Sequence, residues 1–444
     1  MSTPIPSRIA IALVLVLAGP GASAQLVDVA TNATDPSNLA DTEPSISVNP
    51  LNPQEIVIAT FSEGWSAAQG APLWRSTNGG ASWSKVFILP QPAPASGGPG
   101  DQKLAYNGQG KLHVAELAGG VAVPRCLIYR QIGAGGTNLT PGAFYGDDQP
   151  HLDVDISGPS PFFGRAYSPW LDFSAALQLS RVTRSSNGGA AVATVAAGDN
   201  SAFSNRTTRI ALAPGGRAYV IFKTREGALA GGFENAHFRV KRSDDGGVTW
   251  NALGVAGVSV HGAAAVATWF TNQWGNPAKG KVARARSSDA WIAADPSDGD
   301  VYAAYVKREA SGIAQIFVAR STNGGTTWTS TRVSSGALQS AFPEVAVAAN
   351  GNIGVLYVDY NDSGAATIFC HRFAKSTNNG ATWSIETLQC MNPTTIPNAP
   401  NGFLWGDYEG LTAHGFDFYG VFTGQSIGRA VVQFDPIFFK RPAS

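Results

Sequence analysis

Charge is scarce in this sequence and has no dominant sign. Only 14% of the 444 residues are Asp, Glu, Lys or Arg, and the 31 basic residues equal the 31 acidic ones in number. A chain without net charge lacks the long-range attraction that draws basic proteins to nucleic acids and anionic membranes. The composition therefore argues against a nucleic-acid partner. With 44% hydrophobic residues the chain can bury a large core, which excludes a disordered chain or a coiled coil.

Long apolar runs are also rare. After residue 24 no stretch reaches the roughly 18 apolar residues of a membrane-spanning helix, so we expect no membrane span. The apolar run at residues 9–17 follows Arg8 and ends in Gly-Pro-Gly and then Ala-Ser-Ala. This order is typical of a secretory signal peptide. We predict cleavage before Gln25, a secreted or periplasmic protein, and one domain over residues 25–444.

Cysteine occurs only three times. Cys370 and Cys390 lie symmetrically about Gly380, the centre of a predicted hairpin, so antiparallel pairing would bring them opposite each other. We predict a disulfide between them, which agrees with an oxidising compartment. Cys126 is left over, and we expect a small buried apolar residue rather than a catalytic thiol.

Glycine and proline, by contrast, are abundant, with 51 and 27 residues. Both residues interrupt regular structure and demand many turns. An all-β protein with short strands fits this composition best.

One eight-residue motif recurs along the chain and reads Ser-Thr-Asn-Gly-Gly-Ala-Ser-Trp in its first copy. Near-complete copies begin at Ser76, Ser243, Ser321 and Ser376, and a decayed copy begins at Ser185. The Asn or Asp and the hydroxyls can bond the amides of a turn, Gly supplies positive φ, and Trp can cover the next sheet. We expect a tight hairpin in each copy, whose residues hold the fold and take no part in catalysis.

This motif resembles the Asp-box, or bacterial neuraminidase repeat, of the sialidase-like β-propellers. The resemblance implies a β-propeller with a ligand site on the face away from the boxes. It specifies the fold more closely than the activity, because the same box occurs in propellers of many functions.

A second repeat has the pattern strand, turn, strand and occurs seven times, also where no box survives. Seven units of about 60 residues each leave room for a four-stranded blade and its loops. We predict a propeller of seven blades. Six blades are the alternative, as in sialidases, if a terminal unit is an extra strand pair. Ring closure should borrow a strand near residues 26–30, since an unpaired edge strand is a liability.

The first residue of each second-repeat copy changes from unit to unit, whereas the following residue is always apolar. Antiparallel order places these first residues on the face opposite the boxes, at the start of the innermost strands. Buried polar groups without partners cost roughly 1–3 kcal/mol, so packing does not explain such diversity. We predict that several of these seven residues line a polar pocket, and we call them the mouth ring: Ser45, Lys103, His151, Arg209, Trp291, Glu344 and Gly410.

More polar and aromatic residues fall on the same mouth face. Adjacent positions hold Glu43, Asp101, Asp148, Asp289, Asp407 and Tyr408, and loops after the second strands hold Glu63, Trp65, Trp170, Arg225, Arg308, Tyr360 and Asp362. An excess of about 20 residues between residues 252 and 286 carries His261, Trp269 and Trp274 and is interpreted as a lid, a sugar-stacking ledge or a surface insertion. The acids could also cap loop amides or hold a structural cation such as Ca²⁺; we expect no other cofactor.

Aromatic faces stack on sugar rings, so the Trp residues outside the boxes predict a glycan partner. The resemblance implies a glycoside hydrolase of exo-sialidase type, with an Arg cluster for a carboxylate, a Tyr nucleophile activated by Glu, and an Asp acid/base. We assign the candidates in that order: Arg206, Arg209, Arg225 and Arg308; Tyr408 or Tyr360; Glu344 or Glu43; and Asp148 or Asp289. Trp291 and Trp274 would contact the sugar.

Two other functions stay open. A lyase acting on uronate polysaccharide needs a cation beside the carboxylate and a His or Tyr that removes the C5 proton, roles for Lys103, His151, Arg209 and Tyr408. A non-catalytic propeller would bind glycan or protein with the same face. In each case we expect a monomer.

Overall fold

The computed structural model describes residues 25–31, 33, 35, 40–62, 71–89, 97–119, 122–131, 138–174, 178–198, 205–229, 233–262, 290–361, 368–392, 396, 408–429 and 431–444. The predicted signal peptide at residues 1–24 lies outside these ranges. Within them, no helix is long and apolar enough to cross a membrane.

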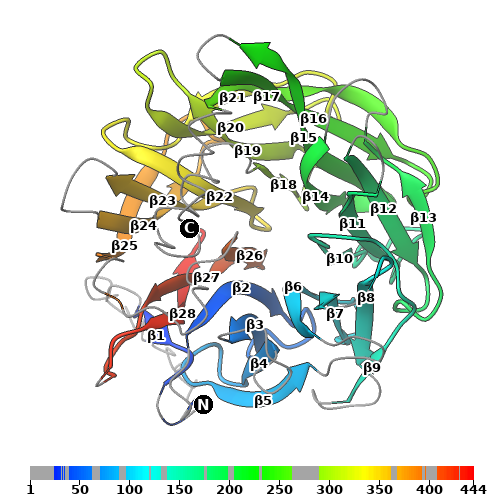
Figure 1. Cartoon of the computed structure of the whole chain (residues 1–444), viewed down its shortest axis with the longest axis vertical. Helices are drawn as coiled ribbons and strands as arrows, with labels where there is room; N and C mark the ends of the chain where they lie inside the picture. The colour runs from blue at the N-terminus through cyan, green and yellow to red at the C-terminus, as the bar shows by residue number, and fades with distance from the viewer. Residues whose placement is uncertain are drawn as a thin grey trace, which may run out of the picture.

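Seven sheets of four antiparallel strands surround a central axis (Figure 1). From the axis outward, the first three blades are β2 (Asp41–Val48), β3 (Ile56–Ser62), β4 (Ala71–Ser76) and β5 (Ser84–Leu89); β6 (Gly97–Tyr106), β7 (Leu112–Gly119), β8 (Cys126–Gln131) and β9 (Leu139–Pro141); and β10 (Asp153–Val154), β11 (Ala166–Asp172), β12 (Leu179–Ser185) and β13 (Ala193–Ala196).

The next three blades follow the same order around the ring. They are β14 (Asn205–Ala213), β15 (Arg217–Leu229), β16 (Phe233–Ser243) and β17 (Asn251–Gly262); β18 (Ala290–Ala294), β19 (Val301–Arg308), β20 (Ala314–Ser321) and β21 (Thr329–Arg332); and β22 (Gln339–Val347), β23 (Ile353–Asn361), β24 (Ile368–Ser376) and β25 (Ser384–Met391). A 3-10 turn, η1 (Pro214–Gly216), joins β14 to β15.

The seventh blade combines both ends of the described chain. It contains β26 (Gly410–His414), β27 (Asp417–Gln425) and β28 (Phe434–Pro442), with β1 (Val27–Asp28) as its outermost strand. Val27 pairs with Phe438 and Asp28 with Ile437. The prediction of seven blades is therefore confirmed, and so is closure by a strand at residues 26–30.

The seven copies of the second repeat form the first and second strands of the seven blades. Blades stack face to face, so a middle strand is buried on both sides: all residues of β11 are buried, and all but one of β23. The outermost strands β13 and β21 are largely exposed. The apolar core therefore lies between neighbouring blades, as in the cluster that joins Tyr219 of one blade to Ile292 of the next.

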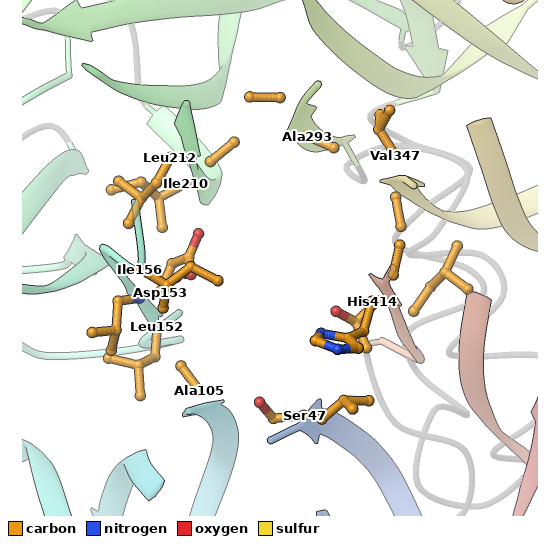
Figure 2. A pocket seen from close by; sticks show the side chains of 18 of the residues that line it. Ser47, Ala105, Leu152, Asp153, Ile156, Ile210, Leu212, Ala293, Val347 and His414 are labelled. Atoms are coloured by element: carbon orange, nitrogen blue, oxygen red, sulfur yellow. Dashed lines mark hydrogen bonds between the residues drawn. The ribbon is translucent and has the colours of Figure 1, made fainter. Parts of the chain in front are cut away.

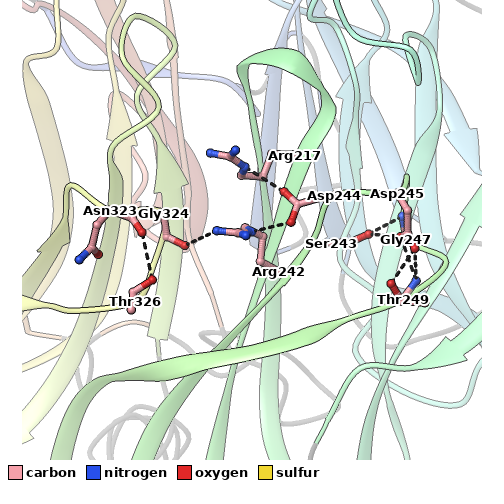
Figure 3. A network of polar contacts seen from close by, with 10 residues as sticks. All are labelled: Arg217, Arg242, Ser243, Asp244, Asp245, Gly247, Thr249, Asn323, Gly324 and Thr326. Carbon is pink, nitrogen blue, oxygen red and sulfur yellow. Dashed lines mark hydrogen bonds and ion pairs between the residues drawn. The ribbon is translucent and has the colours of Figure 1, made fainter.

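The eight-residue boxes form the turns between third and fourth strands. In one of them Ser243 Oγ accepts the Gly247 amide at 2.8 Å and Asp245 Oδ1 accepts the Thr249 amide at 2.9 Å (Figure 3). The box Trp covers the preceding blade rather than the next: Trp83 of the first blade lies edge-on to Phe438 of the seventh. The boxes thus serve the fold, as expected from their chemistry.

Arg242 ties one blade to the next. Its Nη1 donates to the Gly324 carbonyl of the following box turn at 3.2 Å, and its Nε contacts Asp244 at 2.9 Å (Figure 3). Asp244 also accepts Arg217 Nε at 3.0 Å. Polar contacts on the outer rim therefore supplement the apolar contacts between these two blades.

The cysteines have the predicted arrangement. Cys370 and Cys390 lie opposite each other on β24 and β25 and form a disulfide, with a Cα–Cα distance of 4.0 Å. Cys126 has a free thiol, is buried, and lies in an apolar cluster with Ile128 and Leu152.

Candidate functional site

The innermost strands begin with irregular backbone at equivalent positions. The pairing of first and second strands shifts register just before Ser45, Lys103 and Glu344. The residues two positions earlier, Glu43, Asp101 and Phe342, have φ of 51°, 52° and 53°, and Gln149 before His151 has φ of 48°. Positive φ is uncommon outside glycine, and bulges re-aim the side chains that follow. Such repeated irregularity at a mouth is typical of a binding site.

A cavity of about 630 Å³ runs along the axis, within the size range of small-ligand sites. Its mouth end is lined by charged and aromatic side chains, including Lys103, His151, Trp291, Glu344 and Glu409. Its lower part is lined mainly by small and apolar side chains, with Asp153, Asp155 and His414 as exceptions. Figure 2 shows this part, with Ser47, Ala105, Leu152, Ile210, Leu212, Ala293 and Val347 among its lining residues.

Two cations contact two aromatic rings in the mouth. Lys103 Nζ lies 3.7 Å from the ring centre of Tyr408 and 5.2 Å from that of Trp291. Arg209 Cζ lies 5.4 Å and 5.0 Å from the same two centres. The His151 ring meets Trp291 edge to face at 5.0 Å. Five predicted site residues from five blades therefore form one contact cluster.

Tyr408 is coupled to a carboxylate. Its hydroxyl donates a hydrogen bond to Asp101 Oδ1, and both residues are buried. Asp101 has the left-handed backbone described above, and Lys103 follows it by two residues on the same strand. A carboxylate that accepts a phenol proton while a cation lies over the ring is suited to activate that oxygen as a nucleophile.

Glu344 is buried with one oxygen in use. Its Oε2 accepts the Leu411 amide at 2.8 Å, whereas Oε1 has no hydrogen-bond partner among the described residues. Burial raises the pKa of Glu344 to about 8; the charge of Glu409 adds to this rise, and Lys103 and Arg209 oppose it. The side chain therefore holds its proton near neutral pH and can act as a proton donor.

The basic groups are shifted in the opposite direction. Burial lowers the pKa of Lys103 to about 8, and Arg209 adds to this effect against the pull of Glu344, Glu43 and Asp101. Burial, Arg209 and Lys103 together hold the pKa of His151 well below its usual range, so its imidazole is neutral.

Three buried polar atoms of the mouth ring have no hydrogen-bond partner within the described chain: Glu344 Oε1, His151 Nδ1 and Arg209 Nε. Leaving such a buried group unsatisfied costs about 1–3 kcal/mol. His151 and Glu344 line the axial cavity, and Arg209 and Glu344 line a smaller cavity beside it, so a polar ligand that reaches both could satisfy these groups. In the same ranges, no three His, Cys, Asp or Glu side chains gather as ligands for a metal ion.

Part of the ring's polarity serves the fold. Ser45 Oγ accepts the Leu104 amide at 3.1 Å, and Ser47 Oγ accepts the Tyr106 amide at 3.0 Å. Each bond satisfies the free edge of the next blade's innermost strand, which has no further strand to pair with. Glu344 Oε2 does the same for the Leu411 amide. The polarity of Ser45 therefore has a structural role, whereas only one of the two Glu344 oxygens has such a role.

Other predicted residues lie elsewhere. Arg308 donates to the Gly312 carbonyl at 3.2 Å in its own hairpin. Asp148 pairs with Leu171 in the third blade, and its charge helps to raise the pKa of Cys126 after burial, the main cause. Tyr360 is buried against Phe369 in an apolar cluster.

Only some of the remaining predicted residues lie in the part of the chain that the structure describes. Glu43 is buried and close enough to Lys103 to affect its pKa. Arg225 is on β15, in a part whose side chains are not described. Asp289 and Trp274 lie outside the described residues, as do Trp269, Trp65, Glu63, Asp362 and Asp407.

Sequence reasoning missed Glu409 and His371. Glu409 Oε1 lies 3.2 Å from His371 Nε2, and both side chains are fully buried. Glu409 lines the axial cavity and, with Arg209, Trp291, Glu344 and Tyr408, a smaller one beside it. The signal for Glu409 was a charge directly before the innermost strand of the last blade; His371, in a third strand, had none.

Comparison with known proteins gives matches at the level of structure. No family model and no curated protein matches the sequence. A solved structure of a polysaccharide lyase, described as an ulvan lyase, is similar with a TM-score of 0.53 at 10% identity, over 91% of this chain and 94% of the lyase.

A second solved structure, the endosialidase of phage phi92, is similar with a TM-score of 0.51 at 10% identity, over 95% of this chain and 69% of the endosialidase. At such identity the likeness concerns the fold alone. The chain thus has the fold of the sialidase-like β-propellers, as its repeats predict.

Proposed function

We propose that the mouth ring, together with Tyr408 and Asp101, cleaves a glycan at a carboxylated sugar, as a glycoside hydrolase of exo-sialidase type. The observation that carries the proposal is the hydrogen bond from Tyr408 to Asp101, with Lys103 and Arg209 against the same tyrosine ring. This arrangement combines a nucleophile, its base and two cations for a substrate carboxylate in one buried cluster.

Binding would use the polar and aromatic groups of the mouth. Arg209 and Lys103 would pair with the carboxylate of the sugar, since guanidinium and ammonium groups bond carboxylates strongly. The half-buried face of Trp291 would stack on the sugar ring. His151 Nδ1 would exchange a hydrogen bond with a sugar hydroxyl, because burial keeps its imidazole neutral.

Cleavage would proceed in two displacements. The Tyr408 oxygen attacks the anomeric carbon while Asp101 takes the phenolic proton. Glu344 gives its proton to the glycosidic oxygen as that bond breaks. A water molecule then attacks the anomeric carbon of the glycosyl–tyrosine and gives its proton to the ionised Glu344, while Asp101 returns its proton to the tyrosine. Both acids end in their starting states.

A uronate lyase is the second candidate, and a specific observation favours it. The described mouth holds one Arg and one Lys rather than an Arg cluster, next to the neutral imidazole of His151. In the lyase reaction Arg209 would neutralise the uronate, His151 would remove the C5 proton, and Glu344 would protonate the leaving O4 oxygen as the C4–C5 double bond forms. The likeness to an ulvan lyase is compatible with this reading.

Hydrolysis of a fluorogenic sialoside tests the first proposal. Tyr408→Phe and Arg209→Ala should each lower kcat/KM by about 10²–10⁴-fold, because they remove the nucleophile and a carboxylate partner. Arg320→Ala is the matched control, since Arg320 pairs with Asp300 next to the box at Ser321, on the opposite face, and should retain activity. Circular dichroism spectra of all variants must agree.

A parallel assay decides between the alternatives. If the ultraviolet absorbance of an unsaturated uronate increases, and this increase is lost in Arg209→Ala, the lyase replaces the hydrolase as the proposed function. Silence in both assays would overturn an enzymatic function, and retained binding on a glycan array would then assign a non-catalytic glycan-binding propeller.

We also propose that the protein acts outside the cytoplasm. The disulfide between Cys370 and Cys390 persists in oxidising compartments, and the predicted signal peptide at residues 1–24 would direct export. N-terminal sequencing of the exported protein should begin at Gln25.

A further inference from the structure

Two buried carboxyl groups lie side by side at the mouth, Glu344 on β22 and Glu409 just before β26. Their exposed fractions are 2% and 0%. Both line the axial cavity and the smaller cavity beside Tyr408. The amide that binds Glu344 belongs to Leu411, only two residues beyond Glu409. Two buried carboxyl groups that interact electrostatically, as these two do, do not both ionise readily.

The surroundings of Glu409 favour its ionised form. Its Oε2 accepts the Thr423 amide at 2.7 Å and its Oε1 lies 3.2 Å from His371 Nε2. Burial lowers the pKa of His371 to about 3, so the imidazole is neutral and can donate its Nε2 proton. His371 is held in place by stacking on Phe422, with ring centres 4.2 Å apart. Two N–H donors, one on each oxygen, stabilise a carboxylate.

The surroundings of Glu344 favour its protonated form. One oxygen accepts a single amide and the other has no donor among the described residues. The charged groups that face it are Lys103 from β6, Arg209 from β14 and Glu409 from the seventh blade. The two cations favour the carboxylate, whereas burial and Glu409 disfavour it.

We infer that Glu409, held ionised by His371, is a positioning residue that keeps Glu344 protonated and thereby makes Glu344 the proton donor of the mouth. The role of Glu344 as donor rests on the proposed function, whereas its protonation can be measured without substrate. A pair of acids whose environments separate their protonation states is a common way to assign acid and base roles.

Glu409→Gln tests the inference. The variant keeps the size of the side chain and removes its charge, so the Glu344 carboxyl should titrate at least one pH unit lower than in the unchanged protein. The measurement is infrared or ¹³C NMR titration of the Glu344 carboxyl, with Glu344→Gln to assign the signal. Glu386→Gln, an acid paired with Arg441 on the outer rim, is the control and should leave the midpoint unchanged.

A second pair of variants keeps the inference testable if Glu409→Gln does not fold. His371→Gln retains an N–H donor and should leave the Glu344 midpoint near its original value. His371→Leu removes the donor, lets Glu409 take up a proton, and should lower the Glu344 midpoint. The inference would be overturned if the Glu344 midpoint moved by less than a few tenths of a pH unit in Glu409→Gln. It would also be overturned if the midpoint moved as little as this in both His371→Gln and His371→Leu.

The pH profile of activity adds a readout that a structural role would not move. If the protein cleaves a glycan, the alkaline limb of kcat/KM should shift to lower pH in Glu409→Gln by the same amount as the titration. If no activity is found, the proposed function fails and the titration still decides the inference about Glu409.

Discussion

Burial makes the charges of the mouth ring costly for the fold. Lys103, Arg209 and Glu344 are all at most 4% exposed, and one polar atom each of Arg209 and Glu344 has no hydrogen-bond partner within the described chain. Removing charges from water costs several kcal/mol per ion unless partners compensate it. Residues that break local rules in this way are expected at functional sites. Burying these charges therefore lowers the stability of the fold, as the proposed binding site requires.

Glu344→Gln should stabilise the protein in a pH-dependent manner. The pKa of Glu344 rises from 4.5 to about 8 on folding, so this group's contribution to stability is fully present below pH 4.5 and is lost as the pH rises through about 8. Gln does not titrate, and it can still accept the Leu411 amide. The melting temperature of the variant relative to the unchanged protein should increase steadily between these two values.

The slope of this increase is limited to about 1.4 kcal/mol per pH unit for one proton. Glu386→Gln serves as a control, because its half-exposed carboxylate pairs with Arg441 at the rim. Thermal melts at four or five pH values suffice. A difference between variant and unchanged protein that does not vary with pH would contradict the assigned shift.

Comparing the residues at the same position in the seven repeats locates part of the candidate site from sequence. Positions that pack in the core hold similar residues in every repeat, whereas positions with another role differ from repeat to repeat. This difference identifies Lys103, His151, Arg209, Trp291 and Glu344. The same comparison overvalues Ser45, which caps a neighbouring amide, since an edge contact between blades leaves no trace in one blade's pattern. It also misses Glu409, whose partner His371 comes from a third strand and is found only when the blades are placed side by side.

At the scale of the element, the hairpins that carry the boxes depend on glycine. Gly80 has φ of 94°, and a Cβ atom there would lie 2.1 Å from the Phe438 ring of the neighbouring blade. Glycine is therefore required twice, by the backbone and by the space between blades. In the box at Ser321, Gly325 meets the same double demand, because its Cβ would lie 2.6 Å from Leu253.

Gly80→Ala should destabilise the protein more than Gly299→Ala. Gly299 has φ of 82°, and a Cβ there would meet no described atom within 4 Å, so it reports backbone strain alone. Strain costs roughly 1–2 kcal/mol in either variant. Overlap with Phe438 should add about 1–3 kcal/mol in Gly80→Ala. Unfolding in urea measures the stability of both variants. Equal midpoints would show that the neighbouring blades make room for the added Cβ without loss of stability.

At this scale the sequence is a good guide, because each strand pair and each box turn is specified locally. The disulfide follows from the symmetry of Cys370 and Cys390 about a hairpin centre, and the pairing on β24 and β25 confirms it. The bulges before Ser45, Lys103 and Glu344 could not be foreseen, since no glycine marks the residues with positive φ.

The whole molecule depends on how its ring is closed. β1 contributes only two residues, but the adjoining Val29 is fully buried with Trp74 and Phe438. Asp28 accepts the Ile427 amide at 2.7 Å. Without this strand, β28 would present a free edge to other molecules.

A chain beginning at residue 31 should be less stable and more prone to aggregate than one beginning at residue 25. The loss of Val29 burial alone accounts for about 1.5–3 kcal/mol, and the exposed edge of β28 favours association. Thermal unfolding with light scattering measures both effects. Identical melting curves and scattering for the two chains would show that the seventh blade closes without β1.

The blade count follows from the repeats, because each unit packs only on its neighbours and the pattern must recur to build a ring. Ligand chemistry does not follow in this way, since it depends on which unlike residues meet across the axis. Lys103 and Tyr408 are in contact although they come from the second and seventh blades.

The pairing of β1 with β28 also orders events during synthesis. Of the described strands, β1 is made first and β28 last, so the seventh blade stays incomplete until β28 has been synthesised. Such a chain retains a loose terminus throughout its production.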